Sequence, residues 1–383
     1  MKKKHTIIIA ISGGVDSSVA ALLLKQAGHN VIGLFMRNWH DESLTIDNEC
    51  PWIEDSHDAL QICEQLNIPF QIIDLSKEYK ERIVDYMISE YSAGNTPNPD
   101  ILCNREIKFD VFLKYAMQLN ADFIATGHYC IKSEYNNIVQ LKRGRDRIKD
   151  QSYFLCQINQ KQLKKTLFPI GELTKKEVRK IAEENNLVTA KKKDSQGLCF
   201  VGKIKLPVFL QNQLKNKKGD IIEISKQSKL YQLKLENGSE RKYSVSDGKK
   251  IGEHIGAHYF TVGQRKGLNI GGKKDPLFVI GTDVKTNTIF VGMGKEHPGL
   301  FRNNLKIYST SINWLRQDKE LEINEKKEYF VRIRHRQILQ KAILKMTKDY
   351  LYIEFIKKQR GIAKGQFAAW YENEELIGSG PIY

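Results

Sequence analysis

The segment that decides the fold is TIIIAISGGVDSS, residues 6–18. Its first six residues form an apolar, β-branched run typical of a buried strand, and helical spacing begins at Val15. The Ser-Gly-Gly turn between them predicts a phosphate-binding loop, because glycine lets the backbone approach an anion and a helix N-terminus favours negative charge. The loop lacks the Gly-Lys-Ser/Thr of a Walker A motif, which disfavours a P-loop hydrolase. Asp16 is unexpected in an anion site, so it either holds a divalent cation or orients the loop.

Strands and helices alternate outward from this loop. Apolar runs at 31–36, 70–75 and 122–129 predict strands, and helical spacing follows at 56–66 and 78–91. This order predicts an α/β domain over residues 1–206, with a parallel sheet covered by helices on both faces. Ligands bind such sheets at the carboxyl ends of the strands.

The pattern changes near Pro207. Short apolar runs such as KLYQLKL (229–235), HYFTVG (258–263) and LFVIGTDV (277–284) alternate with glycines and turns. We predict a small β-rich domain over 207–299 and an antiparallel barrel over 300–383. The extra length at 226–242 is expected to be a solvated, lysine-rich hairpin. The glycines of GQRKGLNIGG (263–272) favour a β-domain turn over a phosphate nest.

Composition excludes several classes of protein. Of the 383 residues, 41% are hydrophobic and 28% charged, which is not the composition of a disordered or collagen-like chain. No apolar run approaches the roughly 18–20 residues of a membrane-spanning helix, and the apolar start is too short for a signal peptide. Six cysteines in so long a chain do not make a disulfide scaffold, so we expect a cytoplasmic protein. Cys50, His57 and Cys63 fit no common zinc spacing, and no metal site is predicted.

The charge balance favours a polyanionic partner. Lys and Arg number 61 against 45 Asp and Glu, a net charge of +16, and nucleic acid is the first candidate. Arg332, Arg334 and Arg336 alternate, so a strand would place all three on one face beside Tyr329 and Phe330. The alternative is a solvated face whose aromatics belong to the core.

Two cysteines suggest sulfur chemistry. In NPDILCN (98–104), an N-cap at Asp100 would place Cys103 in the first helical turn, where the dipole lowers a thiol pKa. Asp100 would raise that pKa, so it serves better as a proton carrier or as the cap. Cys199 lies in the loop DSQGLCF (194–200). The alternative for Cys103 is a small core residue, the role we also expect for Cys63, within a helix, and for Cys130 and Cys156, in apolar runs.

SGGVDSS resembles the loop of the ATP pyrophosphatase superfamily, whose members split ATP into AMP and pyrophosphate while adenylating a carbonyl oxygen. The ordered set of FMRNW (35–39), NPDILCN, ATGHY (125–129), KDQSYFL (149–155), DSQGLCF, VRIRHRQ (331–337) and AKGQFAAWY (363–371) resembles the bacterial tRNA-specific 2-thiouridylase family over nearly the whole chain. The resemblance implies an adenine-nucleotide alpha-hydrolase-like domain, a central β domain and a C-terminal barrel that contacts tRNA.

The resemblance also implies site residues. ATP would lie on Ala10, Ile11, Ser12, Gly13, Gly14, Val15, Asp16 and Ser17, with Met36 beside the adenine and Gly127 closing the pocket. The tRNA would contact Asn98, Pro99, Asp100, His128, Lys149, Asp150, Gln151, Arg334, His335 and Gln366.

The implied reaction is Mg-ATP-dependent 2-thiolation of the wobble uridine, position 34, in Lys, Glu and Gln tRNAs. Cys199 would carry a persulfide supplied by a donor protein of a cysteine desulfurase relay, with Cys103 as partner nucleophile and Asp100 managing protons. Direct persulfide attack and released sulfide both remain open. The resemblance implies a monomer that grips the anticodon stem-loop after the uridine flips out.

Two other functions share some of these features. An ATP-dependent ligase or amidotransferase acting on a small molecule would use the same loop without paired cysteines or basic β domains. A non-catalytic RNA-binding protein could retain a degenerate nucleotide fold.

Overall fold

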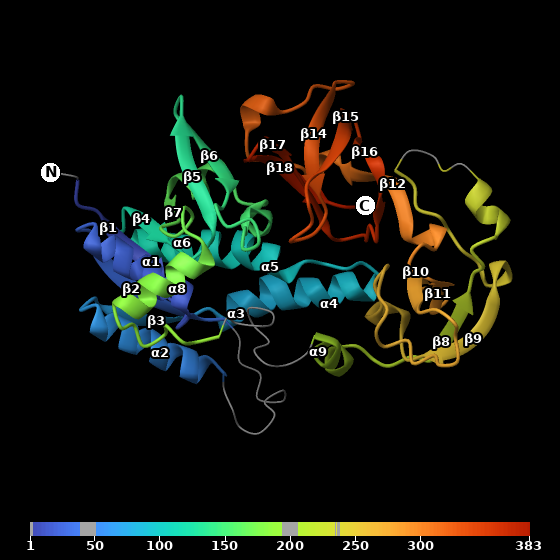
Figure 1. Ribbon diagram of the computed structural model, residues 1–383, viewed down its shortest axis with the longest axis horizontal. Helices are drawn as coiled ribbons and strands as arrows, with labels where there is room; N and C mark the ends of the chain where they lie inside the picture. Colours follow the sequence, from blue (N-terminus) through green and yellow to red (C-terminus); the bar gives the residue numbers. More distant parts are fainter. Residues whose placement is uncertain (1–2, 39–50, 194–205, 234, 236–237) are drawn as a thin grey trace.

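The computed structural model describes residues 3–38, 51–193, 206–233, 235 and 238–383. The described residues form three sheets, numbered here in chain order; in Figure 1 the first lies at the left, the third above the centre and the second at the right. The first is parallel, with the order β3-β2-β1-β4-β7. Its strands are β1 (Thr6–Ala10), β2 (Asn30–Arg37), β3 (Phe70–Asp74), β4 (Phe123–Ala125) and β7 (Thr166–Leu167).

Helices cover both faces of this sheet, as predicted. Ile7 and Ile9 of the central strand pack with α1, α2 and α8, whereas Ile8 packs with the opposite layer, because successive strand residues point to opposite faces. The first layer is α1 (Val15–Gln26), α2 (Pro51–Gln65) and α8 (Lys175–Glu184). The second is α3 (Ser76–Tyr79), a π-helical turn (Lys80–Val84), α4 (Asp85–Ser92), α5 (Pro99–Leu102), a π-helical segment (Cys103–Val111) and α6 (Phe112–Gln118).

The second sheet, that of the central domain, has four strands in the order β10-β11-β8-β9. They are β8 (Gly219–Glu223), β9 (Lys249–His254), β10 (Leu277–Asp283) and β11 (Thr288–Met293), reached through α9 (Leu206–Gln213). Two of the apolar runs are not strands: Lys229–Gln232 and Ala257–Tyr259 form 3-10 turns. Tyr231 packs edge-on against His297, and the Tyr259 hydroxyl donates to the Leu214 carbonyl at 2.6 Å. Their aromatic side chains therefore serve packing rather than strand pairing.

The third sheet is antiparallel and encloses its own apolar core. Its C-terminal strands are β12 (Phe301–Tyr308), β13 (Asn313–Trp314), β14 (Lys326–Arg332), β15 (Gln340–Met346), β16 (Tyr350–Arg360), β17 (Phe367–Glu372) and β18 (Glu375–Pro381). A hairpin of β5 (Cys130–Tyr135) and β6 (Ile138–Arg143), from the first 206 residues, extends it: Lys142 pairs with Glu375. The first and last parts of the chain are thus joined by a shared sheet.

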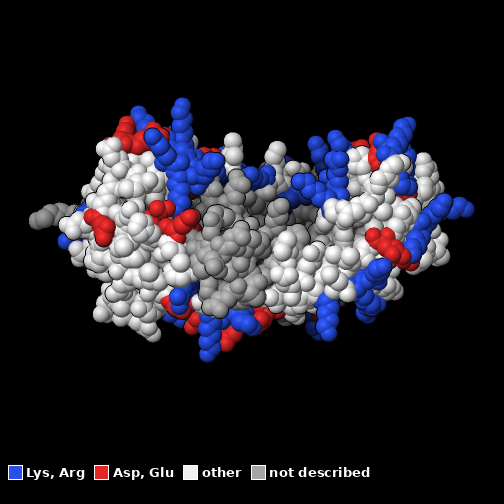
Figure 2. Space-filling model, turned by 90° about the horizontal axis from the view of Figure 1, so that it is seen from below, with Lys and Arg blue, Asp and Glu red and all other residues white. Residues whose placement is uncertain are grey.

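Basic side chains are prominent on the surface. On the face seen in Figure 2, Lys and Arg outnumber Asp and Glu and gather in groups along its edges. No described helix is long and apolar enough to cross a bilayer.

Candidate active site

The loop between β1 and α1 is built around Gly13 and Gly14. Gly13 has φ +67°, and a β-carbon there would lie 2.2 Å from the backbone oxygen of Asp55, so only glycine fits. Gly14 caps α1 without a side-chain hydrogen bond. The Ser17 and Ser18 hydroxyls donate back to the Gly14 carbonyl at 3.0 and 2.9 Å. The helix thus presents backbone amides and its positive dipole end to the carboxyl edge of the sheet, an arrangement suited to phosphate.

Asp16 orients this loop. Its carboxylate accepts hydrogen bonds from the Tyr129 hydroxyl at 2.7 Å and from Lys175 Nζ at 2.7 and 2.8 Å. Lys175 is the first residue of α8, whose N-terminus is fixed by a capping box of Thr174 and Glu177. Of the two roles expected for Asp16, these contacts favour positioning the loop over holding a cation.

Gly127 and Met36 border the loop. A β-carbon at Gly127 would lie 2.8 Å from Ser17 N and 2.9 Å from Asp16 C, so the bare backbone after β4 rests on the start of α1. Met36 is partly buried near the end of β2, where β2 has run past the residues that pair with β1. Both residues therefore lie at the sheet edge that carries the phosphate loop.

The helix carrying Cys103 begins two residues earlier than predicted. Asn98, not Asp100, is the N-cap: its side-chain oxygen accepts from Ile101 N at 3.2 Å, and Pro99 is the first helical residue. Proline suits that position because its missing N–H is not needed there. Cys103 consequently lies in the second turn, where the dipole effect fades. Its side chain has no solvent exposure, so its thiol is buried.

Cys103 begins a π-helical segment that runs to Val111. Asn104, the next residue, donates to the carbonyl oxygens of Asp100 at 3.0 Å and Phe154 at 3.2 Å. Wide turns of this kind are rare and occur frequently at functional sites. The Asn104 bond to Phe154 joins this segment to the 3-10 turn Ser152–Leu155.

The loop at 149–151 is held by buried polar contacts. The Asp150 carboxylate accepts from the amides of Gly144 and Ser152, each at 3.1 Å, and lies 2.9 Å from an Arg332 guanidinium nitrogen. Gln151 accepts from Tyr129 N at 2.9 Å. The Asp150 side chain is therefore occupied within the protein, and it sets the shape of the loop that presents its neighbours.

His128 is buried next to Tyr129, the residue whose amide bonds Gln151. Its Nδ1 lies 2.8 Å from the Thr126 hydroxyl. Burial, reinforced by the charge of Lys108, holds the pKa of His128 well below its usual value. The imidazole is neutral at physiological pH.

The alternating arginines do not share a strand face. β14 ends at Arg332, which is buried against Asp150, and Arg336 has φ 62° in the following turn. The expectation of three arginines on one face was wrong because the chain turns after the first. Arg334 is exposed in that turn, and His335 Nε2 lies 3.1 Å from the Asp150 carbonyl oxygen with its ring 4.4 Å from Phe154. Tyr329 is a core residue.

Gln366 ties the barrel to the loop before α5. Its amide nitrogen donates to the carbonyls of Thr96 at 3.0 Å and Pro97 at 3.3 Å, and its oxygen accepts from Asn98 at 3.2 Å. Thr96 N also donates to the Lys364 carbonyl at 2.7 Å. The C-terminal sheet thus fixes the position of Asn98.

Cys199 and its segment 194–205 lie outside the described residues. The chain before them is anchored by Lys192, which forms ion pairs with Asp55 at 2.7 Å and with Asp58. Because the backbone oxygen of Asp55 lies against Gly13, the described part of the chain that leads up to residue 194 ends near the phosphate loop. Cys63, Cys130 and Cys156 are fully buried, as predicted.

Sequence reasoning missed the residues that hold the site together. Lys175 and Tyr129 bond the Asp16 carboxylate, and Arg332 forms an ion pair with Asp150. The T-x-x-E pattern of residues 174–177 could have located the start of α8. No local pattern predicts that Lys175, the first residue of this helix, pairs with Asp16.

Models of three families match the chain. They are described as tRNA methyl transferase HUP domain (residues 5–203), tRNA methyl transferase PRC-barrel domain (233–293) and Aminomethyltransferase beta-barrel domain (304–382).

Relatives of similar length also match. A Flavobacterium johnsoniae protein named tRNA-specific 2-thiouridylase MnmA is 57% identical, covering 98% of this chain and 99% of its own. A protein of the same name from Christiangramia forsetii is 56% identical over 100% of both chains. Among solved structures, NMN synthetase from Francisella tularensis is 18% identical, with a TM-score of 0.31 over 51% of this chain and 67% of its own.

Proposed function

Because this chain belongs to the tRNA-specific 2-thiouridylase family, we propose that its phosphate loop, its Asn98 loop and two cysteines carry out the steps of tRNA thiolation. The chain is an ATP-dependent tRNA sulfurtransferase. Full-length identity to thiouridylases disfavours both a small-molecule ligase and a non-catalytic RNA-binding protein. The residue roles below are our proposal.

ATP binds with its phosphates at the N-terminus of α1. The observation that carries this role is the glycine-capped helix whose loop admits no side chain at Gly13. The eight loop residues 10–17 contact the nucleotide, Met36 lies beside the adenine and Gly127 closes the pocket. Mg²⁺ accompanies ATP and shields its phosphate charge. Since Asp16 is already paired with Lys175, the loop suits an ion held by the phosphates better than one held by Asp16.

The tRNA presents its flipped wobble uridine, position 34 of Lys, Glu and Gln tRNAs, to Asn98, Pro99 and Asp100. The anticodon stem-loop also contacts His128, Lys149, Asp150, Gln151, Arg334, His335 and Gln366. The position of the Asn98 loop between the first domain and the barrel supports this placement, because both parts of the chain then meet the same RNA. Asp150 contributes by shaping its loop, since its carboxylate is buried.

The O2 atom of uridine is a poor leaving group, so the sulfur transfer begins by converting it into a better one. The uridine O2 attacks the α-phosphorus of ATP and releases pyrophosphate. The terminal sulfur of a Cys199 persulfide then attacks C2 and displaces AMP, while Asp100 manages the proton. The Cys103 thiolate attacks the Cys199 sulfur, which frees 2-thiouridine and leaves a Cys103–Cys199 disulfide for a thiol reductant to reopen. In the released-sulfide route, the Cys103 thiolate attacks the Cys199 sulfur of the persulfide first, which forms the same disulfide and expels hydrosulfide; the hydrosulfide then attacks C2 and displaces AMP.

Cys103 must become accessible to the Cys199 sulfur for this step, because its side chain, at the start of the π-helical segment, is fully buried. The persulfide comes from a donor protein of a cysteine desulfurase relay. With tRNA and ATP as substrates, we propose that the enzyme works in the cytoplasm as a monomer.

The test is a reconstituted reaction. Purified protein, Mg-ATP, a persulfide donor and unmodified tRNA are incubated, and 2-thiouridine, AMP and pyrophosphate are quantified. We expect one AMP for each thiouridine. Pyrophosphate release that needs an amino acid but no tRNA would overturn the proposal.

A further inference from the structure

A cleft of about 830 Å³ lies where the three parts of the chain meet. One wall is the loop at 93–96 after α4, the second comes from the middle domain, and the third from the C-terminal barrel. The volume is within the range of ligand sites, roughly 300–1,000 Å³. None of the residues assigned above to ATP or the cysteine chemistry lines it.

The cleft is strongly basic. Seven Lys or Arg residues line it against two carboxylates, Glu240 and Asp283. Asp283 is occupied by its own turn, where it accepts from the amides of Lys285 at 2.9 Å and Thr286 at 3.3 Å. Among the described residues, five lining lysines have no carboxylate within salt-bridge distance: Lys242, Lys285, Lys306, Lys358 and Lys364.

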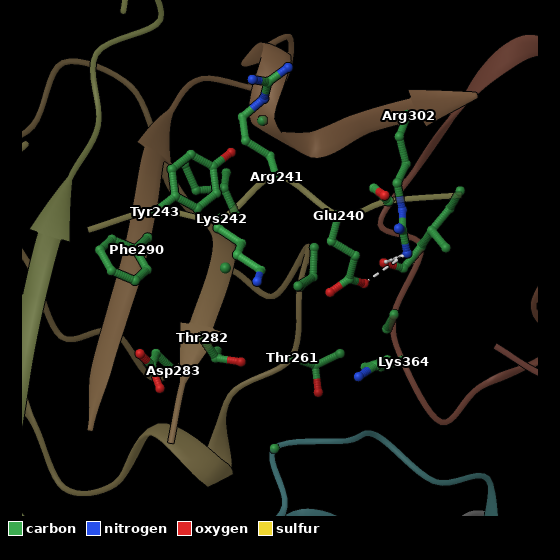
Figure 3. Close-up of a pocket in the computed structure, with 18 of the residues that line it drawn as sticks. Glu240, Arg241, Lys242, Tyr243, Thr261, Thr282, Asp283, Phe290, Arg302 and Lys364 are labelled. Atoms are coloured by element: carbon green, nitrogen blue, oxygen red, sulfur yellow. Dashed lines mark hydrogen bonds and ion pairs between the residues drawn. The ribbon is translucent and has the colours of Figure 1, made fainter. Parts of the chain in front are cut away.

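Arg302 offers a donor without a protein acceptor. One guanidinium nitrogen bonds Glu240 at 2.9 Å and the Ile362 carbonyl at 3.3 Å (Figure 3). Nη1 is buried and has no hydrogen-bond partner within the described chain. Leaving a buried donor without a hydrogen bond costs about 1–3 kcal/mol, and more for a charged group. Because Nη1 is buried, this cation stays inside the wall, and the donors that an anion in the cleft can reach are the lysines.

The lysine-rich insertion contributes a wall of this cleft. Glu240, Arg241 and Lys242 line it, with Tyr243 directly after them. Glu240 and Lys242 are exposed, as expected for a solvated insertion, but the described residues of the segment form no strand, so the expected hairpin was wrong. Arg241 is tied to the carbonyls of Leu230 and Leu233. Figure 3 shows Lys242 entering from the insertion and Lys364 from the opposite wall.

The rim of the cleft is continuous with the Asn98 loop. Thr96 lines the cleft, bonds the Lys364 carbonyl through its amide, and contacts Thr261 through its hydroxyl at 3.0 Å. Two residues further along the chain on each side stand Asn98 and Gln366. A polyanion seated on those two residues would therefore lie next to the rim of the cleft.

We propose that this cleft binds backbone phosphates of the substrate tRNA, with Lys242 and Lys364 as donors. The inference rests on the proposed function, because it extends the same RNA interface. Phosphodiester oxygens match the chemistry: they are anionic, they accept from Arg and Lys, and they recur along a strand that spans several domains. The site grips substrate away from the reacting base.

The test compares tRNA binding by wild type and Lys242→Gln/Lys364→Gln over a salt series, using fluorescence anisotropy. Losing two phosphate contacts should reduce the slope of log Kd against log salt by roughly 1.4–1.8, and weaken binding about tenfold or more at 0.1 M salt. The matched control is Lys161→Gln/Lys348→Gln, which removes two exposed lysines outside the cleft. It should leave the slope within error, and thermal unfolding should be unchanged in both variants.

Three further outcomes distinguish tRNA binding in the cleft from binding of a free phosphate compound, and failure of the cleft inference from failure of the proposed function. If the double variant keeps the wild-type slope but loses binding of inorganic pyrophosphate in calorimetry, the cleft serves a free phosphate compound and the tRNA assignment is overturned. If wild type forms thiouridine while the cleft variant matches it in slope and KM for tRNA, the cleft inference fails alone. Absence of thiouridine from the wild-type reaction would count against the proposed function, with the binding slopes still deciding the cleft.

Discussion

The side-chain amide of Asn98 donates to the side-chain oxygen of Gln366 across 3.2 Å, joining the start of the cysteine helix to the C-terminal barrel. The other end of the Gln366 amide holds the carbonyls of Thr96 and Pro97. A side chain of the last domain therefore helps to position the N-cap of α5. We expect the geometry of the uridine site to depend on a residue about 270 positions away in sequence.

Replacing Gln366 with Ala removes three hydrogen bonds from this loop. At about 0.5–1.5 kcal/mol each, their loss should lower kcat for thiolation roughly tenfold or more. ATP affinity should not change, because the phosphate loop is held by other contacts. Single-turnover thiolation and nucleotide titration measure the two effects. Gln340→Ala, whose amide bonds only a local carbonyl, is the control; an equal loss in both variants would contradict the positioning role.

Gly127→Ala should disable ATP use without unfolding the protein. The added carbon would lie 2.8 Å from Ser17 N, so the first turn of α1 must shift. A displacement of the phosphate site should reduce pyrophosphate release by about 10². Gly271→Ala is the matched control, because nothing lies within 4 Å of a β-carbon there and its φ is not in the left-handed region. Normal activity of Gly127→Ala would rule out the close approach.

The buried pair of Asp150 and Arg332 should be costly to break. Arg332→Met removes the shorter of the two ion pairs of the fully buried Asp150 carboxylate and leaves only the one with Arg143 at 3.4 Å. Breaking a buried pair typically costs about 3–5 kcal/mol, and the remaining Arg143 contact should place this variant toward the lower end of that range. Arg145→Met removes an exposed partner of Glu177 and should cost less than about 1 kcal/mol. Urea unfolding measures both. Similar midpoints for the two variants would show that the buried pair does not hold the domains together.

Stability should fall as the pH drops from 7 to 5. The pKa of His128 is held well below its usual value, chiefly by burial, and the pKa values of His254, His297 and His335 are also lowered by burial. Below a pH of about 6.5 the unfolded chain takes up protons that the folded chain does not, so folding loses up to about 1.4 kcal/mol per pH unit for each such residue. This stability is fully present above pH 6.5.

Urea unfolding at several pH values checks the sign. His128→Asn should flatten the dependence between pH 6.5 and 5 by the share of one histidine. A free energy of unfolding that stayed constant over this range would contradict the burial of neutral imidazoles.

The sequence predicted what neighbouring residues determine. The phosphate loop and the parallel sheet follow from a buried strand, two glycines and a helix start within 13 residues, so they could be read locally. The core position of Cys63 followed from its place in a predicted helix, and those of Cys130 and Cys156 followed from their apolar runs.

The contacts that fix the site could not be read this way. Asp16 and Lys175 are 159 positions apart, and only the packing of α8 beside α1 brings them together. The N-cap fell on Asn98 rather than Asp100 because both residue types favour that position and the proline after Asn98 decides between them. The arginine series failed because a turn after Arg332 removed the strand on which alternation depends.

The most direct test measures 2-thiouridine by mass spectrometry in tRNA incubated with Mg-ATP, a persulfide donor and wild-type, Cys103→Ser, Cys199→Ser or Cys156→Ala protein. We predict thiouridine with wild type and with Cys156→Ala, whose thiol is buried in the core, and none with either serine variant. Retained pyrophosphate release by the serine variants would show that adenylation survives. Full thiouridine formation by Cys103→Ser would contradict the two-cysteine account.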